Sequence, residues 1–239
     1  MIKQLNWDTE FFGYKVGQII MSNNKKFSAS AFQTYVNDYK LIYVLSSEKV
    51  AVNGLKLVDK KVTFQQKTSI KDDLNKNPSA KIESFKEGVH DYESLKKLAL
   101  SSGENSRFKI DENFKNNEYS KLYNQWINNA VYKDKAMDIL IYRDKEILGF
   151  TTIEKKSKYL AVIGLVAVSE QERGKGIASK LIESSINRAF ELGFKTIQVA
   201  TQFENIPAMR LYEKCDFKIK DITYIYHYWN LWYHLTNLF

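Results

Sequence analysis

A strand, a glycine-bearing turn and a helix follow one another between residues 159 and 192, and this succession constrains the fold most. Residues 159–168 form an apolar run of ten. Residues 171–176 then read Gln-Glu-Arg-Gly-Lys-Gly, and apolar residues recur at helical spacing after them. Glycine lets a backbone approach its ligand closely, and unpaired N–H groups at a helix start point toward an anion. The pattern therefore predicts a site for a phosphorylated ligand.

Two common phosphate-binding motifs are excluded at this turn. No Gly-Lys-Ser/Thr sequence follows it, as a nucleotide P-loop requires, and the third glycine of a dinucleotide fingerprint is absent. Residues 196–200 read as a further strand, so the strand–helix–strand unit predicts a parallel pair with a right-handed crossover. Gly193 stands where the C-terminal cap of the helix is expected.

The remaining pattern predicts an α+β protein with a mixed sheet. The expected strands span residues 16–21, 41–45, 56–65, 136–142, 146–153, 159–168 and 196–200, with one or two closing strands over 217–229. The expected helices span 27–39, 91–101, 118–130, 176–192 and 207–214. The helix over 176–192 carries an apolar stripe of Ile177, Leu181, Ile182, Ile186, Ala189 and Phe190.

A polar, apolar-poor stretch divides the chain. Residues 66–82 contain Pro78, one of only two prolines, and are the best candidate for a linker. We therefore expect a smaller N-terminal α/β domain over residues 1–84, which contributes to acceptor binding, and a larger domain over 85–239.

Composition narrows the class of protein. The single cysteine excludes an internal disulfide, and three histidines without ligand spacing predict no metal site. The longest apolar run is about half of what a membrane helix needs, and the first residues form no hydrophobic signal region. We therefore expect a cytoplasmic protein without a membrane span.

The net charge of +8 has two interpretations. Lysines are spread along the chain without an arginine-rich block, so no nucleic-acid partner is predicted. The charge suits a ligand that carries several phosphates, or it is a solvated lysine-rich surface.

Two paired motifs resemble those of the GCN5-related N-acetyltransferases. Residues 171–178 read Gln-x-x-Gly-x-Gly-Ile-Ala, and some thirty residues later 205–214 read Asn-x-x-Ala-x-x-Leu-Tyr-Glu-Lys, followed by Phe217. The resemblance covers roughly residues 85–230 and implies a mixed, mostly antiparallel central sheet with a splayed parallel pair, flanked by helices. The family often has glycine before the closing phenylalanine, where this chain has Asp216, which tolerates left-handed geometry.

The resemblance implies acetyl-CoA as co-substrate, with its diphosphate on the turn and its pantetheine arm along the preceding strand. It assigns cofactor binding to Val166, Ala167, Val168, Gln171, Arg173, Gly174, Lys175, Gly176, Ile177, Ala178 and Asn205. It assigns Tyr212 as the general acid that protonates the departing thiolate. A phenol with a pKa near 10 can donate to a thiolate whose conjugate acid has a pKa near 8.5. The alternative for Tyr212 is a ring packed on the core, and no general base is named.

A second, shorter resemblance lies at the N-terminus. Residues 7–13 (Trp-Asp-Thr-Glu-Phe-Phe-Gly) with 106–111 (Ser-Arg-Phe-Lys-Ile-Asp) resemble acetyltransferases of 4-amino-4,6-dideoxy sugar nucleotides such as TDP-fucosamine. This implies a nucleotide amino sugar of the dTDP-4-amino-4,6-dideoxyhexose type as acceptor, and a homodimer. Aromatic rings can stack on its base or sugar, and cations can pair with its diphosphate. The candidate residues are Trp7, Phe11, Phe12, Arg107 and Lys109, which the alternative interpretation makes ordinary core and surface residues.

Two other functions stay open. An enzyme of the same fold could act on a protein N-terminal amine or another small-molecule amine, although cationic acceptors favour an acidic cleft. The second open function is a non-catalytic module that binds acyl-CoA. The presence of Asn205 and Tyr212 argues against it. His227 either reaches the acceptor site or is a satisfied strand residue.

Overall fold

The computed structural model describes residues 2–21, 32, 36–70, 81–133 and 135–233. Its strands are β1 (Lys3–Gln4), β2 (Val16–Ile20), β3 (Leu41–Ser46), β4 (Lys56–Lys67), β5 (Ile82–Ser84), β6 (Ala136–Arg143), β7 (Ile147–Ser157), β8 (Leu160–Val168), β9 (Thr196–Gln202) and β10 (Lys218–Trp229). Its helices are α1 (Asn6–Phe12), α4 (Tyr92–Ser102), α5 (Arg107–Ile110), α6 (Glu118–Tyr132), η1 (Glu170–Glu172), α7 (Ile177–Glu191) and α8 (Ile206–Lys214).

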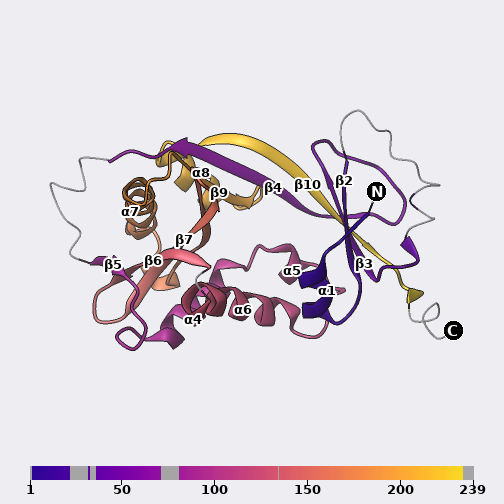
Figure 1. The fold of residues 1–239 in the computed structure, drawn as a ribbon, viewed down its shortest axis with the longest axis horizontal. Helices are drawn as coiled ribbons and strands as arrows, with labels where there is room; N and C mark the ends of the chain where they lie inside the picture. Colours follow the sequence, from indigo (N-terminus) through magenta and orange to yellow (C-terminus); the bar gives the residue numbers. More distant parts are fainter. Residues whose placement is uncertain (1, 22–31, 33–35, 71–80, 134, 234–239) are drawn as a thin grey trace.

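All described strands belong to one ten-stranded sheet in the order β1-β2-β3-β10-β4-β9-β8-β7-β6-β5. Strands β2–β3 and β8–β9 are parallel, and the other neighbours are antiparallel. The α+β class with a mixed sheet is therefore confirmed. Helices α7 and α8 lie on one side of the β6–β9 part, and α4 and α6 lie on the other (Figure 1).

The two long strands β4 and β10 join the N-terminal segments to the rest of the sheet. β4 pairs with β10 on one edge and with β9 on the other, and β10 also pairs with β3 (Figure 1). The sheet thus continues through the proposed boundary near residue 84, and the division into 1–84 and 85–239 stays a prediction. Much of the linker expected over 66–82 lies outside the described residues, as does most of the helix expected over 27–39.

Most local predictions agree with these elements to within a few residues. The closing segment is one strand, β10, and not two. Gly193 follows α7 with a φ of +84°, as a C-terminal cap requires, and Asp216 adopts the expected left-handed conformation with a φ of +69°. The apolar stripe of α7 is buried except at Phe190, which is 45% exposed. The stripe therefore reaches the surface at Phe190, because helical spacing alone does not show where the buried face ends.

A β-bulge interrupts β8 at Gly164 and Leu165. Between the pairs Thr151–Val166 and Ile153–Ile163, the register advances two residues on β7 but three on β8. As a result, Ile163 packs on the α7 side of the sheet, whereas Leu165 packs on the α4 side.

The same bulge marks the place where the parallel pair separates. The register of β8 with β9 runs from the pair Leu160–Thr196 to the pair Ile163–Val199 and stops there. Beyond it, residues 164–168 and 199–202 line a cavity. The splayed parallel pair is therefore confirmed.

The hydroxyl of Thr152 stabilises the bulge, and the loss of this hydroxyl should measurably lower the free energy of unfolding. The backbone N–H of Leu165 donates to the Thr152 hydroxyl at 3.0 Å. Thr152→Val keeps the shape but leaves that N–H buried without a partner, so we expect the free energy of unfolding to fall by about 1–3 kcal/mol in urea denaturation.

Thr151→Val is the matched control. Thr151 is equally buried, and its hydroxyl has no hydrogen-bond partner within the described structure. Its replacement should leave stability unchanged or raise it. Equal losses in both variants would contradict a special role of Thr152.

Candidate functional site

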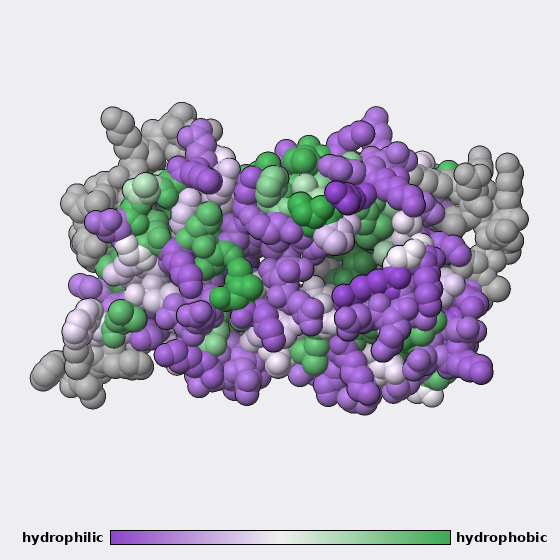
Figure 2. Space-filling view, turned by 180° about the vertical axis from the view of Figure 1, so that it is seen from behind, coloured by the Kyte–Doolittle hydropathy of each residue, from purple (hydrophilic) through white to green (hydrophobic). Residues whose placement is uncertain are grey.

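A cavity of about 640 Å³ lies where β8 and β9 separate. The turn after β8 and the start of α7 form one end, and α8 with the end of β9 forms the other. The α4–α5 connection closes it on the opposite side through Glu104 and Asn105. Seen from behind, the surface is hollowed on the side of α7 and α8, with hydrophobic residues on its walls (Figure 2).

The turn has the backbone geometry of an anion site. Gly174 and Gly176 have φ values of +79° and +80°, which side-chain-bearing residues rarely adopt. Gly176 is the N-cap of α7 and offers no side chain to the first helical N–H groups. These groups therefore remain available to a ligand, and the helix dipole favours a negative charge there.

The structure brings most of the candidate cofactor residues to this cavity. Those that line it are Val166, Ala167, Val168, Arg173, Gly174, Gly176, Ile177, Ala178, Asn205 and Tyr212. Gln171 and Lys175 lie on the same turn but are absent from the lining. Lys175 instead forms an ion pair with Glu172 at 2.8 Å, and Gln171 accepts a hydrogen bond from Ser169 at 3.5 Å.

Asn205 and Tyr212 are positioned by α8. The carbonyl oxygen of the Asn205 side chain caps the helix by accepting from the N–H of Ala208 at 3.3 Å, so its amide N–H groups remain donors for a ligand. Tyr212 is buried, and its ring packs against Phe64 and Phe217 with centroid distances of 5.6 and 6.1 Å. Burial raises the pKa of the Tyr212 phenol well above its usual value, so the group is protonated at neutral pH. The ring is thus both a core residue and a wall of the cavity.

A second cavity of about 440 Å³ shares part of its wall with the first. Trp126, Gly164 and Leu165 line both. The second is also lined by Trp7, Asn129, Ala130, Lys135 and Glu154. The sequence did not reveal Glu154, because a lone acidic residue in a strand gives no motif.

The N-terminal candidates have different surroundings. Trp7 is 44% exposed and stacks on Phe11 with a centroid distance of 5.1 Å. Phe12 packs among the rings of Tyr14, Phe108 and Phe114. Trp7 therefore presents a free face to the second cavity, whereas Phe12 belongs to an aromatic cluster.

Arg107 and Lys109 both lie on the short helix α5, outside the lining of either cavity. The Arg107 guanidinium lies over the rings of Tyr43 and Phe108 at 5.1 and 4.4 Å, and among the described residues its buried Nε has no hydrogen-bond partner. Lys109 is exposed, with its ammonium group 4.9 Å from the centre of the Tyr119 ring. Their roles toward a substrate stay predictions.

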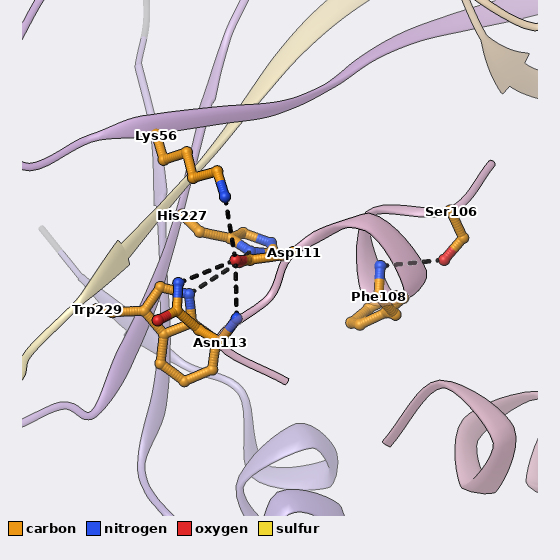
Figure 3. Close-up of polar contacts among 7 residues, drawn as sticks. All are labelled: Lys56, Ser106, Phe108, Asp111, Asn113, His227 and Trp229. Carbon is orange, nitrogen blue, oxygen red and sulfur yellow. Dashed lines mark hydrogen bonds and ion pairs between the residues drawn. The ribbon is translucent and has the colours of Figure 1, made fainter. Parts of the chain in front are cut away.

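Asp111, at the end of α5, anchors this region to β10 (Figure 3). Its buried carboxylate accepts hydrogen bonds from Nδ1 of His227 at 2.6 Å, Nε1 of Trp229 at 2.9 Å and the side-chain amide of Asn113 at 2.9 Å. Lys56 lies 3.7 Å away. His227 is therefore a structural partner of Asp111 through Nδ1, whereas its Nε2 is buried without a hydrogen-bond partner among the described residues.

Comparison with known proteins identifies the domain. The family model described as Acetyltransferase (GNAT) family matches residues 100–217, which contain the glycine turn, the separated strands and α8. The chain carries a GNAT domain. Acetyltransferases of that family use acetyl-CoA as their co-substrate.

Individual relatives match part of their length. The chain is 27% identical to the spore coat polysaccharide biosynthesis protein SpsD of Bacillus subtilis, over 58% of this chain and 48% of that protein. It is 29% identical to dTDP-fucosamine acetyltransferase of Escherichia coli, over 56% and 58% respectively. The chain thus spans about half the length of these curated relatives. A GCN5-related N-acetyltransferase from Sphaerobacter thermophilus has a similar fold, with a TM-score of 0.57, 12% identity, and coverage of 95% of this chain and 75% of that one.

Among the residues that the structure describes, no group of three or more His, Cys, Asp or Glu side chains could hold a metal ion. None of the described helices combines the length and the apolar character needed to cross a membrane.

The burial of His227 predicts a specific acid dependence of the free energy of unfolding, which the hydrogen bond with Asp111 opposes by raising the pKa of His227. Burial lowers the pKa of His227 to about 4 from its usual value near 6.5. The folded state therefore resists protonation, and the stabilisation present above pH 6.5 is lost as the pH falls toward 4.

His227→Asn can still donate to Asp111 but cannot be protonated. Between pH 6.5 and 4, the free energy of unfolding of this variant should fall less steeply than that of the wild type. The two slopes should differ by at most ~1.4 kcal/mol per pH unit, the contribution of one titrating group. Urea denaturation at several pH values measures the free energy of unfolding of each protein, and each value is compared with that of the same protein at pH 8. Parallel curves for both proteins would contradict the assignment.

Proposed function

We propose that this protein transfers the acetyl group of acetyl-CoA to the amine of a nucleotide-linked amino sugar of the dTDP-4-amino-4,6-dideoxyhexose type. The observation that carries the proposal is the single cavity that joins the glycine turn to the Tyr212 ring along the separated strands. The names of two relatives, a spore coat polysaccharide biosynthesis protein and a dTDP-fucosamine acetyltransferase, favour this class of acceptor.

The residues present fit coenzyme A. The turn of Gly174 and Gly176 with the start of α7 would hold the diphosphate, and Arg173 adds a positive charge beside it. Val166 to Val168 lie beyond the last β8–β9 pair, so their backbone groups facing β9 would hold the pantetheine amides. Asn205 would donate its free amide N–H groups to the same arm. The bound cofactor supplies a thioester whose carbonyl carbon is open to attack by an amine.

Tyr212 would act on the leaving group. The acceptor amine attacks the thioester carbonyl, the carbon–sulfur bond breaks, and the thiolate of coenzyme A needs a proton. The Tyr212 phenol is protonated at neutral pH, and it can donate that proton to sulfur, although burial raises its pKa and makes it a weaker acid. The second product is the acetamido sugar.

The acceptor would approach from the N-terminal segments. Trp7 and Phe11 offer stacked rings for a sugar or base, and Arg107 or Lys109 would pair with the diphosphate. A cytoplasmic location and a homodimer belong to the same proposal. Its partner is a small-molecule amine and not a nucleic acid.

Tyr212→Phe tests the mechanism. We expect kcat to fall about 10²- to 10⁴-fold, because a general acid contributes that much, while acetyl-CoA binding by calorimetry stays unchanged. Tyr226→Phe is the control, since this buried tyrosine lies outside both cavities and its hydroxyl accepts from the N–H of Val50. The Tyr226→Phe variant should have a lower free energy of unfolding but the kcat of the wild type. Normal turnover in Tyr212→Phe would remove the phenol from the reaction.

A panel of acceptors tests the substrate class. Thiol release from acetyl-CoA should be fastest with dTDP-4-amino-4,6-dideoxyhexoses, and slow with an N-terminal peptide amine, a polyamine or an aminoglycoside. Transfer to a peptide without transfer to any sugar nucleotide would overturn the proposed acceptor. Acetyl-CoA binding without transfer to any amine would favour a non-catalytic module.

A further inference from the structure

The second cavity contains one acidic side chain, Glu154 of β7, at the place where the two cavities meet. Gly164 and Leu165 of the β8 bulge form part of both walls, and Trp126 of α6 completes the shared edge. Trp7 of α1 lies on the outer wall. A volume of about 440 Å³ is within the range of small-molecule sites.

The Glu154 carboxylate occupies the room left by the missing side chain of Gly164. A Cβ atom added to Gly164 would lie 2.1 Å from Oε1 of Glu154 and 2.9 Å from Oγ1 of Thr152. The carboxylate therefore lies directly against the bulge. On the other side of the bulge, the adjacent residues Leu165 and Val166 line the first cavity.

The surroundings of Glu154 suit a proton acceptor. Burial raises the pKa of its carboxyl above the usual value, and the charge of Lys135 and a hydrogen bond with Thr152 oppose this rise. Lys135 is the charged side chain that faces it in the cavity, where Trp7, Trp126 and Asn129 are neutral. A carboxylate with a raised pKa accepts a proton more readily than one in water.

Other acidic and basic groups are less well placed. Glu204 is exposed and lines neither cavity, and His227 is bonded to Asp111 away from both. Asp59 is also buried, and burial raises its pKa to about 6, but it lies outside both linings.

We propose that the second cavity binds the amine-bearing ring of the acceptor, with Trp7 and Trp126 against the ring and Glu154 on the amino group. This rests on the proposed function and adds the base that it lacks. Glu154 takes one proton from the ammonium group, and the free amine attacks the thioester at the edge of Trp126, Gly164 and Leu165 that both cavities share. After the new carbon–nitrogen bond has formed, the second N–H proton passes to solvent. Tyr212 donates its phenolic proton to the departing sulfur and is reprotonated from solvent. One acetyl group is transferred, and no redox partner is needed.

Glu154→Gln separates this role from a structural one. We expect kcat/KM for the amino sugar to fall about 10²- to 10³-fold at pH 7, with unchanged acetyl-CoA affinity and melting temperature. The loss should shrink as the pH rises toward the pKa of the acceptor amine, because solvent then supplies free amine. Glu146→Gln, in the exposed turn before β7, is the matched control and should retain full activity. A loss that is constant with pH, or no loss, would overturn the proposal.

Gly164→Ala provides an independent test without removing the carboxylate. The new methyl group must displace Glu154 from the bulge, so the same pH-dependent loss is expected with Glu154 intact. Full activity in this folded variant would contradict the assigned position. Absence of transfer by the wild-type protein to any amine would instead refute the proposed function, whereas an active wild type with a normal Glu154→Gln variant would refute the role of Glu154 alone.

Discussion

The rest of the site depends on one hydrogen bond, from the backbone N–H of Leu165 to the hydroxyl of Thr152. A bulge leaves a backbone group without its ladder partner, and a buried N–H without a partner is costly. Thr152 supplies an acceptor from its side chain, so the chain can place an extra residue in β8 at this point. The shift ends the pairing with β9, and the first cavity begins where the pairing stops.

The two sides of the bulge differ in their electrostatics. On one side, the start of α7 and Arg173 favour an anion, as a diphosphate requires. On the other, Glu154 is the acidic group of a cavity with two indole rings, as an amino group on a sugar ring would require. The buried Asp111 is kept apart from both by its bonds with His227 and Trp229, and it holds α5 against β10.

Features contained in one continuous segment could be predicted. The positive φ values at Gly174 and Gly176, the end of α7 at Gly193 and the left-handed Asp216 all follow from local backbone preferences. Most of the candidate cofactor residues line the cavity, and those at 173–178 and Asn205 belong to the two quoted motifs. The predicted apolar stripe of α7 is buried except at Phe190, whose exposure depends on where the sheet ends. The contact of His227 with Asp111 could not be foreseen, since 116 residues separate them.

By itself, the sequence determined the order of strands and helices around the glycine turn, because hydrophobic period and glycine conformation are local properties. It also determined the chemistry offered by Asn205 and Tyr212 at fixed spacing on α8. Only the tertiary structure decided that β4 enters the sheet between β9 and β10, and that Glu154 faces Gly164 across a bulge. The physical reason is that strand partners and register are set by the packing of distant segments, and a one-residue shift moves side chains to the opposite face.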